Sequence, residues 1–184
     1  MDRSAASDIG DSGAEDADGG TVEQAKRVCL RLLGVRAYSR AELVQRLTTK
    51  GYAPEVSEQA LDRLAEVGLV DDAAFAEQWV HSRHRFSGKG RQALARELRR
   101  KGVAQSDAAP ALAAITAADE EARATELIHR KLRSLPRDLD RDRAFRRLAG
   151  MLARRGYAQH MIYRVVEAAL AERDIPGDIA GYID

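Results

Sequence analysis

The sequence predicts an all-α protein, an elongated array of three tandem three-helix repeats, and three observations support this. Leu, Ala, Arg and Glu dominate the composition and aromatic residues make up only 5%, so strong helix formers outnumber the residues that favour strands. A short frame of two leucines and a glycine occurs three times, with its leading leucines 51 and 54 residues apart. A further helical stretch precedes each copy of the frame, which makes three helices per repeat with the one that follows.

The first twenty residues are acidic, and we predict a disordered tail over residues 1–20. They contain six acidic residues and one cation, a net charge of −5, whereas the whole chain has a net charge of +1. The rest of the chain therefore has a net charge of +6, which indicates an acidic tail on a basic body. The tail has almost no apolar residues to bury, as is typical of disorder.

Two helix starts have the same signature, a hydroxyl residue followed three positions later by Glu or Gln. Thr21 precedes Gln24, and Ser39 precedes Glu42; each pair can satisfy two backbone amides at a helix start. The first helix of each repeat is predicted at 22–34, 72–86 and 120–134. The residues expected to pack inward are Leu30 and Leu33 in the first, Phe75, Trp79 and Val80 in the second, and Leu127, Ile128 and Leu132 in the third.

The repeated frame predicts the second helix of each repeat and the glycine that ends it. Two leucines four residues apart share one helix face, and glycine readily adopts the left-handed conformation that ends helices. The copies are Leu43-x3-Leu47-x2-Lys50-Gly51-Tyr52, Leu94-x3-Leu98-x2-Lys101-Gly102-Val103 and Leu148-x3-Leu152-x2-Arg155-Gly156-Tyr157. The apolar residues ten and thirteen positions after each glycine predict the core of a third helix: Leu61 and Leu64, Leu112 and Ile115, Val166 and Ala169.

These elements predict repeats over residues 21–70, 71–118 and 119–173, with a C-terminal tail at 174–184. Because a three-helix unit this short buries little surface, we expect neighbouring repeats to share a core. Ser106 is the expected cap of the third helix in repeat two, which would place Pro110 at the end of its first turn. The run Ile175-Pro176-Gly177-Asp178 is expected to break the last helix.

Basic residues are concentrated in two places, which indicates an acidic or polyanionic partner. Residues 81–102 contain eight cations and one acidic residue, a net charge of +7. Within them Arg96, Arg99 and Arg100 lie opposite the leucines of their helix. In repeat three, Arg143, Arg147 and Arg154 can share an outer helix face. Charge alone leaves an acidic protein surface and DNA phosphates as alternative partners, beside the simpler interpretation of a solvated surface.

No constellation in the sequence indicates catalysis, a metal or a cofactor. His81 and His84 lack the further ligands of a zinc site. The run Asp138-x-Asp140-x-Asp142 has Arg143 and Ala149 where a calcium loop has Gly and Glu, so an aspartate that caps the next helix is the preferred interpretation.

Two further features suggest where the protein acts. Cys29, the single cysteine, is expected in the core of a protein from a reducing compartment. With no secretory signal or apolar run of membrane-spanning length, we expect a cytoplasmic, non-enzymatic protein without a membrane anchor.

The order and spacing of further residues resemble the RecX regulatory family over about residues 22–172. The resemblance begins at Ser39-Arg40-x-Glu42-Leu43 and continues through Leu47 and Lys50-Gly51. It includes Gly68-Leu69-Val70-Asp71-Asp72-x2-Phe75-Ala76-x2-Trp79, then Arg83, Lys89-Gly90 and Leu98-x2-Lys101-Gly102. The third repeat keeps the frame with few of the distinctive residues.

The resemblance implies a modular helical protein that lies in the groove of a RecA filament on single-stranded DNA. Such a protein would restrain filament growth, ATP hydrolysis, strand exchange and co-protease activity. The resemblance also makes Arg83, Lys89 and Arg91 the preferred partner contacts in repeat two. We expect a monomer with at most weak direct DNA binding; the alternative is a helical protein that binds nucleic acid directly.

Overall fold

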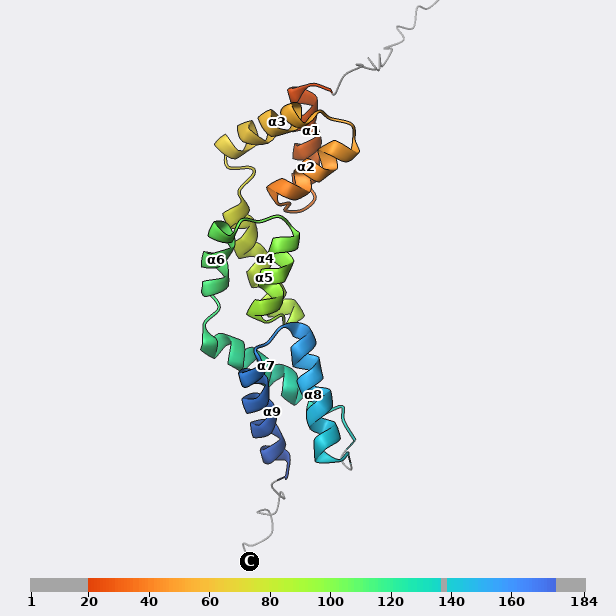
Figure 1. Cartoon of the computed structure of the whole chain (residues 1–184), viewed down its shortest axis with the longest axis vertical. Helices are drawn as coiled ribbons and strands as arrows, with labels where there is room; N and C mark the ends of the chain where they lie inside the picture. The colour runs from red at the N-terminus through yellow and green to blue at the C-terminus, as the bar shows by residue number, and fades with distance from the viewer. Residues whose placement is uncertain (1–19, 137–138, 175–184) are drawn as a thin grey trace, which may run out of the picture.

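The computed structural model describes residues 20–136 and 139–174, and within these ranges it contains nine helices and no strand (Figure 1). Repeat one consists of α1 (Val22–Leu33), α2 (Arg40–Thr49) and α3 (Pro54–Glu66). Repeat two consists of α4 (Asp72–Ser87), α5 (Arg91–Arg100) and α6 (Gln105–Ala113). Repeat three consists of α7 (Ala117–Leu132), α8 (Arg141–Arg155) and α9 (Gln159–Asp174).

The three repeats follow one another along the long axis of the molecule, which confirms the predicted all-α, elongated array (Figure 1). In each repeat, as Figure 1 is drawn, the second helix lies to the right of the third. Residues 1–19 of the tail predicted over 1–20 lie outside the described residues, as does the predicted break at 175–178. None of the described helices combines the length and the apolar character that crossing a bilayer requires.

Helix caps account for where most of the helices begin. The reciprocal caps predicted at Thr21 and Ser39 are both present. Asp71 caps α4, and Asp140 caps α8 by accepting a hydrogen bond from the backbone N–H of Arg143 at 3.1 Å. Thr116 forms a third reciprocal cap, so α7 begins three residues before the predicted start at 120.

The third helix of repeat two differs from the prediction. The helix α6 begins after Ala104, no side chain caps it, and Ser106 lies inside it. Pro110 is therefore an interior residue of the helix, where it cannot donate a backbone hydrogen bond to the preceding turn. The helix ends at Ala113, three residues later.

The buried apolar side chains form three separate clusters, one in each repeat, so the expectation of a shared core is wrong. Across this division, the partly buried Ala37 of repeat one packs against the cluster of repeat two. Leu43, Leu94 and Leu148, which lead the three copies of the frame, are each fully buried within the cluster of their own repeat. In the first helix of repeat one, Cys29 is buried and Leu33 packs against the core, as predicted. Leu30 is 44% exposed, so its predicted inward position is wrong.

The repeats join where the second helices meet end to end, and we call these two contacts joint one and joint two. In joint one, the hydroxyl of Ser39, at the start of α2, donates a hydrogen bond of 2.6 Å to the carbonyl of Lys101, at the end of α5. In joint two, the backbone N–H of Gly90, before α5, donates one of 2.9 Å to the carbonyl of Arg155, at the end of α8. These bonds hold α8, α5 and α2 in sequence along the array.

The glycines after the second helices allow this close approach. Gly102 and Gly156 both have positive φ, 74° and 84°. A Cβ atom on Gly102 would lie 2.3 Å from that of Ala41, and one on Gly156 would lie 2.4 Å from that of Ala93. The left-handed conformation and the contact across the joint both require glycine.

A carboxylate from the first helix of the next repeat completes each joint. Asp72 accepts a hydrogen bond of 2.7 Å from the backbone N–H of Arg40, the first residue of α2. Glu120 accepts one of 2.8 Å from the backbone N–H of Arg91, the first residue of α5. The joints therefore satisfy amides that the starts of α2 and α5 leave without an intrahelical partner.

Candidate functional site

Six of the predicted partner-binding residues are exposed arginines on two second helices. Arg96, Arg99 and Arg100 lie on α5, and Arg143, Arg147 and Arg154 lie on α8. Leucines on the other side of each helix are buried, as the helical period requires. None of the six forms an ion pair with the residues that the structure describes, so each guanidinium is available to an acidic partner. Their role in binding stays a prediction.

Arg83 and Lys89, two residues preferred from the family resemblance, are engaged inside repeat two. Arg83 donates two hydrogen bonds of 3.0 Å to the carboxylate of Glu97, and the Lys89 ammonium lies 3.7 Å from it. The indole N–H of Trp79 donates a further bond of 3.0 Å to Glu97. Burial acts to raise the pKa of Glu97, but the bonds from Arg83 and Trp79 lower it on balance.

Arg91, the third residue preferred from the resemblance, is part of joint two. Its side-chain Nε donates a hydrogen bond of 2.8 Å to Glu120, the carboxylate that also accepts from its backbone N–H. Glu120 is 2% exposed, whereas the Arg91 side chain is 44% exposed. The backbone N–H and the Nε of Arg91 therefore connect repeats two and three through Glu120, while the rest of the Arg91 side chain reaches solvent.

A surface hollow of about 770 Å³ in repeat three is strongly positive. Among the described residues its lining contains five cations, no acidic residue and two apolar side chains: Lys131, Arg146, Arg147, Arg154, Arg155, Leu135 and Met151. The sequence prediction included Arg147 and Arg154 but missed Lys131, which lies on α7 and comes close to α8 only in the folded chain. This concentration of guanidinium groups is suited to phosphates or carboxylates.

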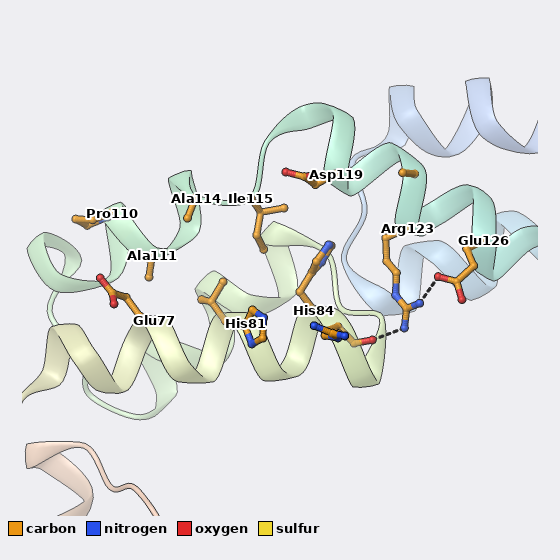
Figure 2. Close-up of a pocket in the computed structure, with 13 residues that line it drawn as sticks. Glu77, His81, His84, Pro110, Ala111, Ala114, Ile115, Asp119, Arg123 and Glu126 are labelled. Carbon is orange, nitrogen blue, oxygen red and sulfur yellow. Dashed lines mark hydrogen bonds and ion pairs between the residues drawn. The ribbon is translucent and has the colours of Figure 1, made fainter.

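Another hollow, of about 760 Å³, lies between α4, α6 and α7, and Figure 2 shows its lining. His81 and His84 come from α4, and Arg123 and Glu126, which form an ion pair, come from α7. The ring Nδ1 of His84 is 2.8 Å from the carbonyl oxygen of Lys89. None of the predicted partner-binding residues lines this hollow.

In the comparison with protein families, each repeat matches a separate family model. The model of the RecX first three-helix domain matches residues 25–64, that of the second matches 71–112, and that of the third matches 119–166. The three domains occur in order and together match more than half of the chain. The chain belongs to the RecX family. This RecX assignment agrees with the resemblance that the frame and the signature residues of repeat two predict.

Relatives and solved structures agree with the assignment to RecX. The chain is 56% identical over 152 residues to "Regulatory protein RecX" of Mycolicibacterium smegmatis, covering 81% of each chain. It is 52% identical over 149 residues to the protein of that name from Mycobacterium avium, covering 81% of this chain and 86% of that one. The crystal structure of RecX from Lactobacillus salivarius matches with a TM-score of 0.73 at 18% identity, over 82% of this chain and 97% of that one. This structure supports the fold.

Proposed function

We propose that this chain binds a RecA filament on single-stranded DNA and restrains filament growth, ATP hydrolysis, strand exchange and co-protease activity. The curated relatives are named as regulatory RecX proteins, and regulation of RecA is what the RecX resemblance implies. The observation that contributes most from the structure is the row of exposed arginines on α5 and α8, which form no ion pair with the described residues.

The geometry favours a partner that extends along the molecule. Joint two places α8 and α5 end to end, so their arginines can meet a repetitive surface at more than one place. Several modest contacts from one molecule raise the local concentration of each remaining contact, and no single contact needs to be strong. Occupying adjacent recombinase subunits in this way would restrict their addition and motion, with no covalent chemistry by this chain.

The test of the proposal is the DNA-dependent ATP hydrolysis of the cognate RecA during titration with this protein. A parallel assay measures binding of the protein to the same single-stranded DNA without RecA. We expect inhibition at concentrations at which naked DNA is still unbound. Absence of inhibition at concentrations that saturate naked DNA would contradict the proposal.

A charge-reversal variant tests the arginines of α5 directly. We expect Arg96→Glu, Arg99→Glu and Arg100→Glu together to weaken inhibition about tenfold or more, a loss of about 1.4 kcal/mol or more in binding free energy, because the reversed charges would repel a partner that binds cations. The matched control reverses three exposed cations elsewhere, Arg27, Arg31 and Arg133, with the same change in net charge. Equal loss in both variants would assign the effect to net charge and not to α5.

The alternative, direct binding of nucleic acid, is favoured by the hollow lined by cations in repeat three. Released counterions would make such binding salt-dependent, with a slope of about 0.7 per neutralised phosphate for single strands. Reversal of Arg147 and Arg154 would then lower the slope by about 1.4 in the absence of RecA. A slope that does not change in this variant would exclude the hollow as the DNA contact.

A further inference from the structure

The hollow of about 770 Å³ in repeat three, which we call the cationic hollow, collects positive charge from two helices. Lys131 comes from α7, and Arg146, Arg147, Arg154 and Arg155 come from α8. No acidic side chain among the described residues lines it, whereas three acidic residues line the hollow in Figure 2. A recess lined by one sign of charge concentrates ions of the opposite sign.

Three of these arginines have no acidic partner in the part of the chain that the structure describes. Arg146, Arg147 and Arg154 are exposed, and their side chains form no ion pair or hydrogen bond with the described residues. On the same helix, Arg141 does pair with a carboxylate, that of Glu167 at 2.7 Å. Because unpaired like charges repel one another, the cluster lowers the stability of the folded chain unless an anion binds to it.

Gly150 lies among the same three arginines in the interior of α8. It follows Arg146 and Arg147 by four and three residues and precedes Arg154 by four, so all of them share one helix face. Gly150 does not have a positive φ. Apart from the helix backbone, a Cβ there would approach only Nη1 of Arg154, at 3.2 Å. Neither backbone conformation nor packing therefore requires glycine, which destabilises a helix interior relative to alanine.

The missing Cβ allows the Arg154 guanidinium to lie against the helix at Gly150. This position brings the guanidinium towards the turn that carries Arg146 and Arg147, because side chains on a helix point towards its N-terminus. The sequence at this position thus lowers the stability of the helix and gathers cations at the same time. Both effects indicate a site shaped for an anion.

Arg155 links the cationic hollow to joint two. Its Nη1 donates a hydrogen bond to the carbonyl of Ser87, at the end of α4, and its backbone carbonyl accepts the bond from Gly90. The side chain is only partly exposed. The Arg155 guanidinium is therefore held in place before a ligand binds, which reduces the entropy that binding would cost.

The lining of the cationic hollow favours linked phosphates over a single carboxylate. Guanidinium groups match the oxygens of phosphates with pairs of parallel hydrogen bonds. One carboxylate would leave most of the five cations without a counter-charge, whereas adjacent phosphates bring several negative charges into the same volume. Leu135 and Met151 add apolar contacts, and the volume lies within the range of small-molecule sites, roughly 300–1,000 Å³.

We propose that the cationic hollow binds a small oligophosphate, such as the phosphate chain of a nucleotide, with Arg146, Arg147 and Arg154 gathered around Gly150 as its main contacts. Cations that converge on one volume from two helices favour a compact ligand over a nucleic-acid strand, whose phosphates follow one another in a row. This inference does not depend on the proposed binding of RecA.

Calorimetric titration of the full-length chain with inorganic tripolyphosphate, at fixed ionic strength, tests the site. We expect one saturable site per chain, and Arg147→Gln should weaken binding about tenfold or more through the loss of a charge-assisted hydrogen bond. The matched control, Arg143→Gln, removes the same charge from an exposed arginine of α8 that does not line the hollow and should leave the affinity nearly unchanged. Equal losses in the two variants, or no saturable binding to the native chain, would overturn the proposal.

Gly150→Ala distinguishes binding from folding, because it should change the two in opposite directions. Alanine is the better helix former, and the flexible Arg154 side chain can move away from the new Cβ, so the urea midpoint of unfolding should rise. The displaced guanidinium should bind tripolyphosphate less well, so the affinity should fall. Unchanged affinity in this more stable variant would overturn the gathering of the arginines around Gly150.

Competition with nucleic acid identifies the source of the phosphates. At equal total phosphate concentration, ATP should displace tripolyphosphate, and a short oligothymidylate without terminal phosphates should displace little of it. Displacement by the oligothymidylate that is as efficient as displacement by ATP would assign the cationic hollow to a nucleic-acid strand and overturn the proposal.

Discussion

Gly156→Ala should destabilise the protein through joint two. The new Cβ would lie 2.4 Å from the Cβ and the backbone nitrogen of Ala93, and the φ of +84° is unfavourable for alanine. The left-handed conformation costs roughly 1–2 kcal/mol, and packing an additional carbon into a filled contact costs about 1–3 kcal/mol. We expect a loss of about 2–5 kcal/mol in the free energy of unfolding.

Gly68→Ala is the matched control, because it differs from Gly156→Ala mainly in the contact. Gly68 has a φ of +71°, and a Cβ there would meet nothing within 4 Å. This variant should lose only the conformational cost, roughly 1–2 kcal/mol. The difference between the two variants therefore measures the contact between α5 and the end of α8.

Urea unfolding followed by circular dichroism measures both variants, and amide hydrogen exchange shows where the structure opens. If the clash separates the repeats, the Gly90 amide, which bonds to the carbonyl of Arg155 at 2.9 Å, should exchange faster in Gly156→Ala than in Gly68→Ala. Equal losses of stability together with unchanged exchange of Gly90 would refute the importance of close packing at joint two.

Three further predictions follow from groups inside the repeats. Glu97→Gln should cost about 1.5–3 kcal/mol at neutral pH, the range for hydrogen bonds to charged groups. The folded-state pKa of Glu97 is lowered, so its charge stabilises the folded protein above the unfolded-state pKa, and this stabilisation is lost as the pH falls through the folded-state pKa. The difference in stability between wild type and Glu97→Gln should therefore shrink in acid. A difference that stays constant with pH would argue against a charged Glu97. Tyr157→Phe removes the bond from the buried hydroxyl to the carbonyl of Gly88 at 3.3 Å and should cost about 0.5–1.5 kcal/mol in thermal or urea unfolding; unchanged stability would show that the bond contributes nothing. Burial raises the pKa of Cys29 to about 11, so a disulfide reagent at pH 8 should react slowly with the native chain and rapidly in denaturant, whereas equally fast reaction in both would contradict a buried thiol.

The helices and their ends were predictable because they depend on local sequence. The glycines of the frame end all three second helices with positive φ, as predicted, and Ser39 caps α2 together with Glu42. The early start of α7 also had a local signal, Thr116 followed three residues later by Asp119, which the prediction overlooked. These features need only contacts a few residues apart in the sequence.

The partners of the cations were not predictable from helical periodicity, because they lie further apart in the chain. Arg83 and Glu97 are 14 residues apart, and Arg91 and Glu120 are 29 residues apart and belong to different repeats. A charge count treats Arg91 and Arg96 alike, although the first pairs with a buried carboxylate and the second is exposed without an ion pair among the described residues. The joints were missed for the same reason, since glycine at a helix end already has a local explanation.

The end-to-end order of the second helices has an electrical consequence. Each helix has roughly half a positive charge at its N-terminus and half a negative charge at its C-terminus. The joints bring the C-terminal end of α5 to the start of α2, and that of α8 to the start of α5, so these partial charges offset one another inside the array. The partial charges that remain are positive at the start of α8 and negative at the end of α2. The array therefore has a net dipole along its length, which favours one orientation of the molecule in the field of a charged polymer.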